Sequence, residues 1–229
     1  MQTVLVTGAS GNLGQAVVKK FIENGYKVAG TVLHHDVDGL DFPADRFEKK
    51  VVDLGDEKDA AAFVGGIVEK HKTIDAAILT VGGFAAGKIA DTTTADVMKQ
   101  YQLNFETAYN IARPVFLQMM KQGYGKIFLI GSRPGLDAKG GKGMIAYGLA
   151  KSLIFRLAEL MNDEAKGHDV VTSVIVPSTI DTPQNRKAMP DANYANWVKA
   201  EDIANTIVWH CSPEAKTLRE PVIKVYGNA

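Results

Sequence analysis

Short apolar runs alternate with longer helical patterns along this chain of 229 residues, and this alternation constrains the fold more than any other feature. Several runs are apolar on both faces, as strands covered by helices on both sides of a parallel sheet must be. Because strand, helix and strand repeated in this order form right-handed crossovers, we predict an α/β fold with a doubly wound parallel sheet of about seven strands flanked by helices. The predicted strands span residues 3–7, 27–32, 47–54, 74–81, 126–131, 170–176 and 221–227.

Helical patterns fill the intervals between these strands, and no Pro/Ser-rich linker, internal repeat or low-complexity tract divides the chain. We therefore predict a single domain over residues 1–229. Gly25 and Gly167 stand where the C-caps of two helices are expected. The predicted helices cover residues 12–24, 56–70, about 95–121, about 144–166 and 201–210.

Charge and composition indicate which binding partners and which cellular compartment the protein is expected to have. Lys and Arg total 26, as do Asp and Glu, so the net charge is zero and nothing favours an anionic polymer such as nucleic acid. The single cysteine, Cys211, excludes an intrachain disulfide and fits a reducing compartment. The chain begins with a strand pattern in place of a charged and apolar leader, and no apolar run reaches the length of a membrane span. We expect a cytoplasmic protein without a nucleic-acid or membrane partner and without a metal site.

The segment TGASGNLG at residues 7–14 directly follows the first predicted strand. In a turn from strand to helix, Gly8 permits a tight reversal, Gly11 lets the backbone approach a ligand, and Gly14 lets the helix pack on the sheet. Free N–H groups at the start of that helix can bind a pyrophosphate. The motif therefore predicts a dinucleotide site in a Rossmann-type sheet, with an ordinary glycine turn as the alternative.

The segment YGLAK places Tyr147 and Lys151 four residues apart, on one face of a predicted helix. A phenol is a poor acid at neutral pH unless its anion is stabilised, and a fixed ammonium group provides that stabilisation. Ser132 follows an apolar strand at the carboxyl edge of the predicted sheet. These residues predict a site of proton transfer; the alternatives are a Tyr–Lys pair that serves packing and a serine that caps a loop.

With these motifs in this order, the chain resembles the short-chain dehydrogenase/reductase family over nearly its whole length. TGASGNLG is similar to the family's glycine-rich motif, VVDL is similar to its adenine-pocket segment, and TVGG stands where the family commonly has Asn-Asn-Ala-Gly. YQLNF contains the helix asparagine, Asn104, and PSTIDT follows the Pro-Gly-x-x-x-Thr pattern with Ser178 in place of glycine. The resemblance implies cofactor contacts from Gly8, Ser10, Asn12, Leu13, Gly14, Asp53, Leu54, Gly82, Lys151, Pro177, Ile180 and Thr182.

The resemblance also implies an NAD(P)-dependent oxidoreductase with four catalytic residues. Tyr147 is expected to give a proton to the substrate as hydride arrives from the nicotinamide. Lys151 is expected to lower the pKa of Tyr147 and to bind the nicotinamide ribose. Ser132 would hold the acceptor atom of the substrate, and Asn104 would order a water chain that reprotonates Lys151. The expected substrate is a carbonyl or pterin-like small molecule.

Three stretches are similar to the dihydropteridine reductases of this family: DAAILTVGGFAAG, GMIAYGLAK and DTPQNRKAMPDANYANW. The chain also carries Asn104 and Ser132, which the animal pterin enzymes lack. A complete set of Asn, Ser, Tyr and Lys is what a carbonyl reductase uses. Dihydropteridine reduction therefore stands as the more specific alternative within the predicted function.

The end of the second predicted strand bears on the choice between NADP(H) and NAD(H). An acidic residue there would bind the ribose 2′-hydroxyl and repel a 2′-phosphate, but Val32 occupies that place. His34 or His35, if protonated, would favour a phosphate, whereas Asp36 could turn toward the ribose. We expect NADP(H), with NAD(H) as the alternative.

Residues 184–199 form a connection long enough to serve as a substrate lid, and it contains Met189, Tyr194 and Trp197. With Phe84 as the opposite wall, such a lid would close on a flat ring and exclude water. Packing of the loop onto the domain explains the same residues. The prediction that Phe84, Met189 and Trp197 touch the substrate therefore rests mainly on the family likeness.

Two further functions fit parts of the sequence. A redox-silent NADP(H) sensor would keep the fold, but it would have no need of the Tyr147–Lys151 pair. A sugar-nucleotide epimerase or dehydratase would match the spacing of the three glycines, but those enzymes usually add a C-terminal substrate domain, and few residues follow Thr182 here.

The assembly expected from the family is a homodimer or homotetramer. In the family the helices near residues 95–121 and 144–166 commonly pair across a two-fold axis. The segment SLIFRLAELM in the second of them has apolar side chains in excess of those needed for one buried face.

Overall fold

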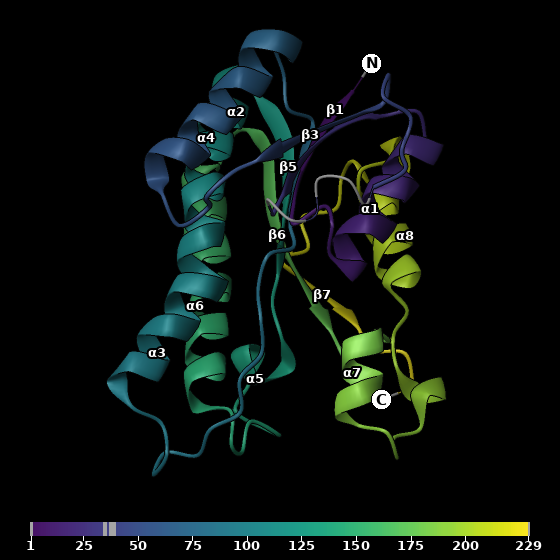
Figure 1. The fold of residues 1–229 in the computed structure, drawn as a ribbon. Helices are drawn as coiled ribbons and strands as arrows, with labels where there is room; N and C mark the ends of the chain where they lie inside the picture. The colour runs from purple at the N-terminus through teal and green to yellow at the C-terminus, as the bar shows by residue number, and fades with distance from the viewer. Residues whose placement is uncertain (1, 34–35, 37–39, 229) are drawn as a thin grey trace.

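The structure is a computed structural model that describes residues 2–33, 36 and 40–228. Its centre is one sheet with the strand order β3-β2-β1-β4-β5-β6-β7, in which every neighbouring pair is parallel (Figure 1). The predicted α/β fold with a doubly wound, seven-stranded sheet is therefore confirmed. The strands are β1 (Thr3–Thr7), β2 (Lys27–Val32), β3 (Phe47–Val51), β4 (Ala76–Leu79), β5 (Tyr124–Ile130), β6 (Asp169–Pro177) and β7 (Val222–Val225).

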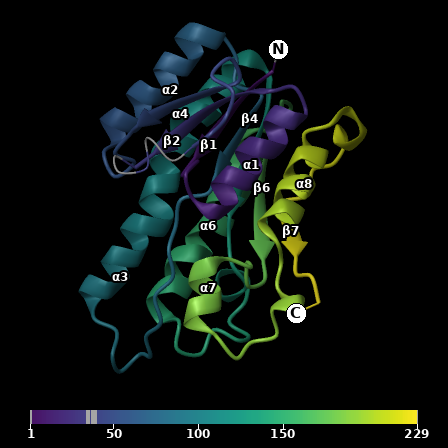
Figure 2. The ribbon, with the colours of Figure 1, turned by 45° about the vertical axis from the view of Figure 1, so that its right-hand side comes forward.

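Helices cover both faces of the sheet, with α2, α4 and α6 on one face and α1 and α8 on the other (Figures 1 and 2). Successive side chains of a strand point to opposite faces, so Ile78 and Phe128 join one core while Leu79 and Ile127 join the other. The helices are α1 (Asn12–Glu23), α2 (Glu57–His71), α3 (Thr94–Tyr101), α4 (Thr107–Gln122), α5 (Arg133–Leu136), α6 (Ile145–Glu164), α7 (Pro183–Ala188) and α8 (Ala200–His210); shorter turns are a π-helix (Gln102–Glu106) and 3-10 turns at Tyr194–Asn196 and Pro213–Ala215.

Several predicted elements differ from the structure. The strands predicted over 74–81 and 221–227 are shorter, at Ala76–Leu79 and Val222–Val225. The strand predicted over 47–54 ends at Val51, because Asp53 turns the chain by accepting a hydrogen bond from the Gly55 N–H at 2.9 Å. The helix predicted over 95–121 is divided into α3 and α4 by the π-helix between them. A π-turn shifts the faces of the two flanking helices relative to each other, and hydrophobic periodicity alone does not reveal it.

Glycine and aspartate residues of the sequence mark the ends of several helices. The C-caps of α1 and α6 are Asn24 and Ala165, so the predicted caps Gly25 and Gly167 lie one and two residues beyond them. Both glycines have φ values, 83° and 88°, in the left-handed region that glycine adopts without strain. Asp56 caps α2 by accepting hydrogen bonds from two backbone N–H groups of its first turn. None of the helices in the described part of the chain combines the length and apolar character needed to cross a bilayer.

Because all strands are parallel, the loops after β1, β4, β5 and β6 lie at one edge of the sheet, and the order of the strands reverses between β1 and β4. Both α5, which follows β5, and α7, which follows β6, lie at this carboxyl edge (Figure 1). Ligands of doubly wound sheets bind at the edge where the strand order reverses. A ligand site is therefore expected at the carboxyl edge of the sheet, near β1 and β4.

Candidate active site

The glycine turn after β1 has the shape of a phosphate cradle. Gly8 has φ of 63°, and its N–H donates to the Thr31 hydroxyl at 3.1 Å. A Cβ at Gly14 would lie 2.0 Å from the Gly8 carbonyl oxygen, so no larger residue fits where α1 crosses the turn. Gly11 is the N-cap of α1, and no side chain in the described residues caps its first turn. The N–H groups at the start of α1 thus remain for an anion, which fits the pyrophosphate of a dinucleotide.

Two contacts tie this turn to distant parts of the chain. The Ser10 hydroxyl donates to the Asp36 carboxylate at 2.7 Å, so an acidic group lies beside the turn even though Val32 is apolar. The Asn12 amide donates to the Gln184 side chain of α7 at 2.9 Å. The residues His34 and His35, which favoured NADP(H) in the sequence, lie outside the described residues. Gln184 was not among the predicted site residues, and no local pattern marks it.

The predicted adenine-pocket residues follow β3. Leu54 is buried, and its carbonyl accepts a hydrogen bond from the Asn110 amide of α4 at 2.9 Å. The Asp53 carboxylate accepts from the N–H of Gly55 in its own turn. The position of Leu54 is therefore set by α4, through a residue that the sequence did not single out.

Tyr147 lies in the first turn of α6, next to two other predicted site residues. Its ring meets the ring of Phe84 edge to face, with 5.2 Å between the centroids. Burial raises the pKa of Tyr147 above its ordinary value, and a hydrogen bond with Ser132 opposes that rise. The phenol therefore keeps its proton at neutral pH. Ser132 itself caps α5, where its hydroxyl oxygen accepts from the Gly135 N–H at 3.2 Å.

Lys151 lies one turn after Tyr147 and is only 4% exposed. Its ammonium donates to the Ile130 carbonyl at the end of β5, at 2.7 Å. Burial lowers the pKa of Lys151 to about 8. The causes of the Tyr147 shift are burial and Ser132, so the influence of Lys151 on the pKa of Tyr147 stays a prediction.

Asn104 lies in the π-helix and is 1% exposed. Its carboxamide pairs with both backbone groups of Gly83, accepting from the N–H at 3.0 Å and donating to the carbonyl at 2.9 Å. The same amide donates to the Gln100 side chain at 3.0 Å. Asn104 therefore braces the loop after β4 through direct protein contacts. The water chain expected from the family likeness stays a prediction.

Gly82 lies against the side chains of Asn104 and Lys151. A Cβ at residue 82 would be 2.7 Å from Asn104 Oδ1 and 3.1 Å from Lys151 Nζ. The first distance is shorter than real Cβ contacts, so glycine is required there for the loop after β4 to close on these two groups.

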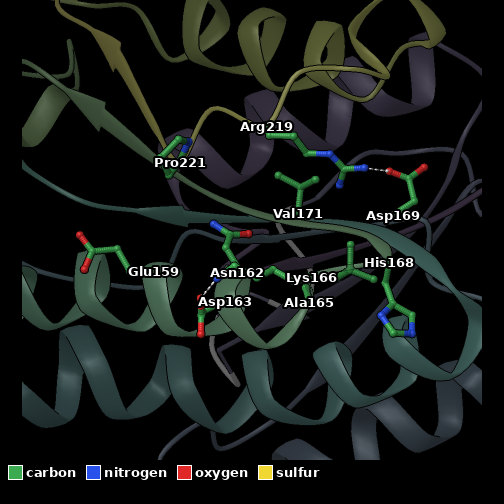
Figure 3. A pocket seen from close by; sticks show the side chains of 12 residues that line it. Glu159, Asn162, Asp163, Ala165, Lys166, His168, Asp169, Val171, Arg219 and Pro221 are labelled. Atoms are coloured by element: carbon green, nitrogen blue, oxygen red, sulfur yellow. Dashed lines mark hydrogen bonds and ion pairs between the residues drawn. The ribbon is translucent and has the colours of Figure 1, made fainter.

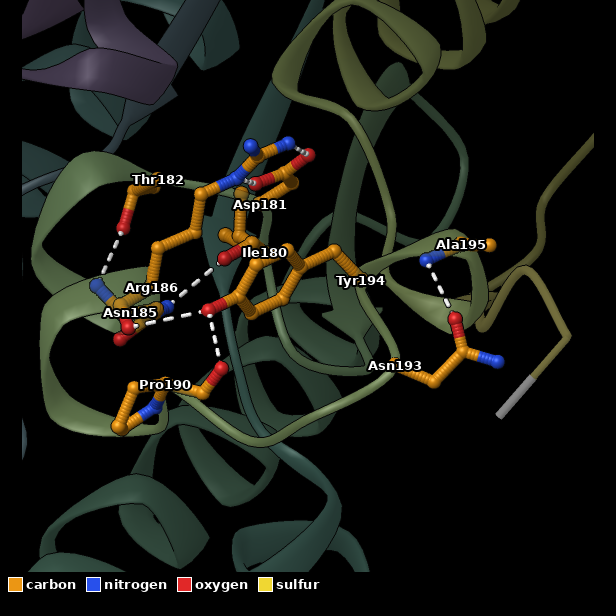
Figure 4. Close-up of polar contacts among 9 residues, drawn as sticks. All are labelled: Ile180, Asp181, Thr182, Asn185, Arg186, Pro190, Asn193, Tyr194 and Ala195. Atoms are coloured by element: carbon orange, nitrogen blue, oxygen red, sulfur yellow. Dashed lines mark hydrogen bonds and ion pairs between the residues drawn. The ribbon is translucent and has the colours of Figure 1, made fainter.

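The segment predicted as a lid consists of α7, a loop and a 3-10 turn (Figure 4). Arg186 makes a two-pronged ion pair with Asp181, at 2.6 and 2.7 Å, and its guanidinium stacks over the Tyr194 ring at 4.7 Å. The Tyr194 ring in turn packs against Trp197, with 4.8 Å between centroids. Trp197 thus serves packing within the segment, whereas Met189, just after α7, is 40% exposed.

The loop after β6 holds the remaining predicted cofactor residues. Pro177 ends β6, Ile180 pairs with Val198 across the base of the lid, and Thr182 caps α7 by accepting from the Asn185 N–H at 3.1 Å. Ser178, which stands where the family has glycine, donates to the Tyr226 carbonyl at 2.8 Å. The serine is accommodated because its hydroxyl anchors the loop to the end of β7.

A hollow of about 720 Å³ lies away from these residues, at the amino end of β6 and the C-terminal end of α6 (Figure 3). Four charged groups on its wall form two ion pairs, Arg219 with Asp169 at 2.8 Å and Lys166 with Asp163, while Glu159 pairs with Arg156 outside it. None of the predicted site residues lines this hollow. Its size alone does not connect it with the chemistry at the carboxyl edge.

Comparisons with known proteins show the family to which the chain is similar. Residues 2–193 match the family model described as short chain dehydrogenase. A dihydropteridine reductase from Dictyostelium discoideum is 27% identical over 227 residues, covering 97% of this chain and 94% of the relative. A 3-oxoacyl-acyl-carrier-protein reductase from Buchnera aphidicola is 25% identical over 240 residues, covering 99% of this chain and 96% of the relative.

The solved structures show the same fold. A short-chain type dehydrogenase/reductase from Mycobacterium ulcerans superposes with a TM-score of 0.88 at 22% identity. The match covers 99% of this chain and 89% of that one. At this level of identity the likeness concerns the fold alone.

Proposed function

The chain belongs to the short chain dehydrogenase family and is an NAD(P)-dependent oxidoreductase, and on this premise we propose that it reduces a carbonyl or pterin-like substrate with Tyr147 as the proton donor. When bound, the nicotinamide dinucleotide supplies the hydride. The observation that carries the proposal is the meeting of Tyr147, Ser132 and Lys151 at the carboxyl edge of the sheet, the edge that also holds the glycine turn.

The protonation states of these residues suit a reduction. Burial raises the pKa of Tyr147, so the phenol is protonated and can donate at neutral pH. Ser132, hydrogen-bonded to that phenol, would hold the acceptor atom of the substrate beside it. When Tyr147 gives up its proton, the phenolate would be stabilised by the ammonium of Lys151 one turn away. With a pKa of about 8, Lys151 is mostly charged at pH 7 and can play this part.

Two observations support a flat, ring-shaped substrate. Phe84 is 61% exposed although its ring packs on Tyr147, so an aromatic face lies beside the proton donor. The Dictyostelium relative is named a dihydropteridine reductase, and a pterin is a flat ring system. The Buchnera relative is named for a 3-oxoacyl substrate, which supports a carbonyl acceptor in place of a pterin. Dihydropteridine reduction is the second candidate function.

The family binds NAD(P)(H), and we extend this to a preference for NADP(H). Val32, the last residue of β2, offers no carboxylate to an adenosine ribose. The Asp36 carboxylate beside Ser10 works against this preference, because it would repel a 2′-phosphate. Fluorescence titration with NADPH and NADH measures the balance, and binding of NADH tighter by about tenfold, or 1.4 kcal/mol, would overturn it.

The proposed activity is tested by NADPH and NADH oxidation with quinonoid dihydropterin and with a panel of aldehydes, ketones and quinones. Tyr147→Phe removes the phenolic proton and should slow turnover by roughly 10²–10⁴ with the best substrate. Tyr124→Phe is the matched control, since Tyr124 begins β5 at the opposite end of the sheet. Equal rates for Tyr147→Phe and the wild type would remove Tyr147 from the mechanism. Tight dinucleotide binding without turnover of any substrate would favour a redox-silent sensor.

We also propose that two copies of the chain associate through α4 and α6. Apolar side chains remain exposed on both helices, among them Leu117 on α4 and Leu149 and Leu160 on α6, each more than half exposed. Surface helices of a monomer usually present polar side chains there. Light scattering should give a dimer or tetramer for the wild type and a smaller species for Leu160→Glu. A wild-type monomer at micromolar concentration would refute the assembly.

A further inference from the structure

Gln100 is a buried polar residue for which the reaction proposed above has no use. It lies near the end of α3 and is 4% exposed. Its side-chain oxygen accepts a hydrogen bond from Asn104 Nδ2 at 3.0 Å, and its main-chain carbonyl approaches the same nitrogen at 3.3 Å. One residue, a turn earlier in the helix, thus supplies two acceptors to the Asn104 amide.

These contacts fix which way the Asn104 carboxamide is turned. Oδ1 accepts from the Gly83 N–H, while Nδ2 donates to the Gly83 carbonyl and to Gln100. A flipped carboxamide would set its NH₂ group against the Gly83 N–H and its oxygen against three acceptors, the Gly83 carbonyl and the two oxygens of Gln100. Gln100 therefore stabilises the same orientation of the Asn104 carboxamide that the hydrogen bonds to Gly83 favour.

The oxygen end of Asn104 and the ammonium of Lys151 both border the backbone of Gly82. The point where a Cβ of residue 82 would stand is 2.7 Å from Asn104 Oδ1 and 3.1 Å from Lys151 Nζ, so both atoms border one small space. An oxygen next to an ammonium favours its charged form, and an NH₂ group in the same place disfavours it.

No charged side chain in the described residues offsets the burial of Lys151. Burial alone accounts for the lowering of its pKa to about 8. The elements packed on α6 are α3, the π-helix, α5, β5 and β6. The titratable or charged groups on these elements are Asp96, Lys99, Tyr101, Glu106, Tyr124, Lys126, Arg133 and Asp169, and α6 itself also carries Tyr147, Arg156, Glu159, Asp163 and Glu164. The polar groups next to the ammonium of Lys151 include the Ile130 carbonyl, which accepts its hydrogen bond, and the neutral amide of Asn104, which borders the same space at Gly82.

We propose that Gln100 is a positioning residue that holds the Asn104 carboxamide with its oxygen toward Lys151 and so supports the charged form of this lysine. The inference rests on the proposed function, in which the Lys151 ammonium stabilises the Tyr147 phenolate. Without the Gln100 side chain, Nδ2 loses an acceptor and the carboxamide is held less firmly. The ammonium then loses part of its stabilisation.

The test measures the pKa of Lys151 directly, by an NMR titration of lysine ε-carbon signals in the protein without dinucleotide. Loss of the signal in Lys151→Met identifies it. Gln100→Met removes the acceptor while keeping a side chain of similar length, and the pKa of Lys151 should fall by about half to one pH unit. Gln100→Glu keeps an acceptor oxygen and adds charge, so the pKa should be equal to that of the wild type or higher.

Gln122→Met is the matched control, because Gln122 also makes several hydrogen bonds to the backbone but at the far end of α4. It should lower stability without moving the pKa of Lys151. In the pH profile of turnover, Gln100→Met should shift the alkaline limb toward lower pH, and Gln100→Glu should not.

An unchanged Lys151 pKa in folded Gln100→Met would overturn the proposal, as would a fall of equal size in Gln122→Met. If Gln100→Met does not fold, Gln100→Glu decides the matter, since a lowered pKa there contradicts the assigned orientation. The titration needs no substrate, so it separates a failure of this inference from a failure of the proposed activity.

Discussion

Gly82→Ala tests whether the loop after β4 must close on Asn104 and Lys151. The added methyl group would stand 2.7 Å from Asn104 Oδ1, closer than real Cβ contacts come, and 3.1 Å from Lys151 Nζ. The Asn104 side chain cannot move away from this methyl group without losing hydrogen bonds, because its amide is bonded to both backbone groups of Gly83 and to Gln100.

The magnitude follows from the contacts that would be lost. Loss of the two hydrogen bonds to Gly83, at about 1 kcal/mol each, lowers the free energy of unfolding by about 2 kcal/mol. For a chain of this length that lowers Tm by roughly 4–8 °C. A displacement of about 1 Å at the ammonium of Lys151 should cost roughly 10²-fold in kcat.

The assay combines thermal unfolding with the turnover measurement. Gly65→Ala is the control: residue 65 lies in α2 with nothing within 4 Å of the new Cβ, so it should raise the stability by about 1 kcal/mol and leave turnover unchanged. If Gly82→Ala keeps both the Tm and the kcat of the wild type, the loop yields freely and the reasoning is wrong.

Three further predictions follow from the charges of the site. Lys151→Met should abolish turnover yet raise the free energy of unfolding at pH 7 by about 2 kcal/mol, because it removes a buried cation. The pKa of Lys151 in the folded protein, about 8, lies below the unfolded value of 10.5, so the wild type gains stability as the pH rises from about 8 to 10.5. Denaturation measured as a function of pH should therefore show the stability advantage of the variant shrinking over that window. Asp36→Asn should strengthen NADPH binding relative to NADH in fluorescence titrations, because the carboxylate that would repel a 2′-phosphate is gone, and an unchanged ratio would mean that Asp36 lies away from the ribose. Arg186→Met should loosen the lid, since it breaks the pair with Asp181 and the stacking on Tyr194; proteolysis within residues 184–199 should become faster while the Tm stays nearly constant, and equal cleavage rates would contradict the bracing role.

Asn104 illustrates what could and could not be predicted about the site from the sequence. The family likeness marked the position, but not its contacts. The sequence predicted a continuous helix over residues 95–121, whereas a π-turn interrupts it and carries Asn104 in its middle. The hydrogen bonds to Gly83, 21 residues away, could not be inferred, because they depend on how the loop after β4 settles on that turn.

The lid shows the same limit. Its extent and its aromatic residues were visible in the sequence, and so was the alternative that they serve packing. In the structure Tyr194 contacts both the Arg186 guanidinium and the Trp197 ring, which accounts for two of these aromatic residues by contacts inside the segment. Only side-chain positions distinguish a ring that packs inward from one that faces a substrate.

Patterns within single segments determined the alternation of strands and helices, the glycine turn and the Tyr147–Lys151 pair, because strand and helix periods and the freedom of glycine act over a few residues. The tertiary structure decided which segments meet: Ser10 with Asp36 across 26 residues, and Asn12 with Gln184 across 172. Such contacts depend on the packing of helices and loops at the carboxyl edge of the sheet, and no local pattern of residues encodes that packing.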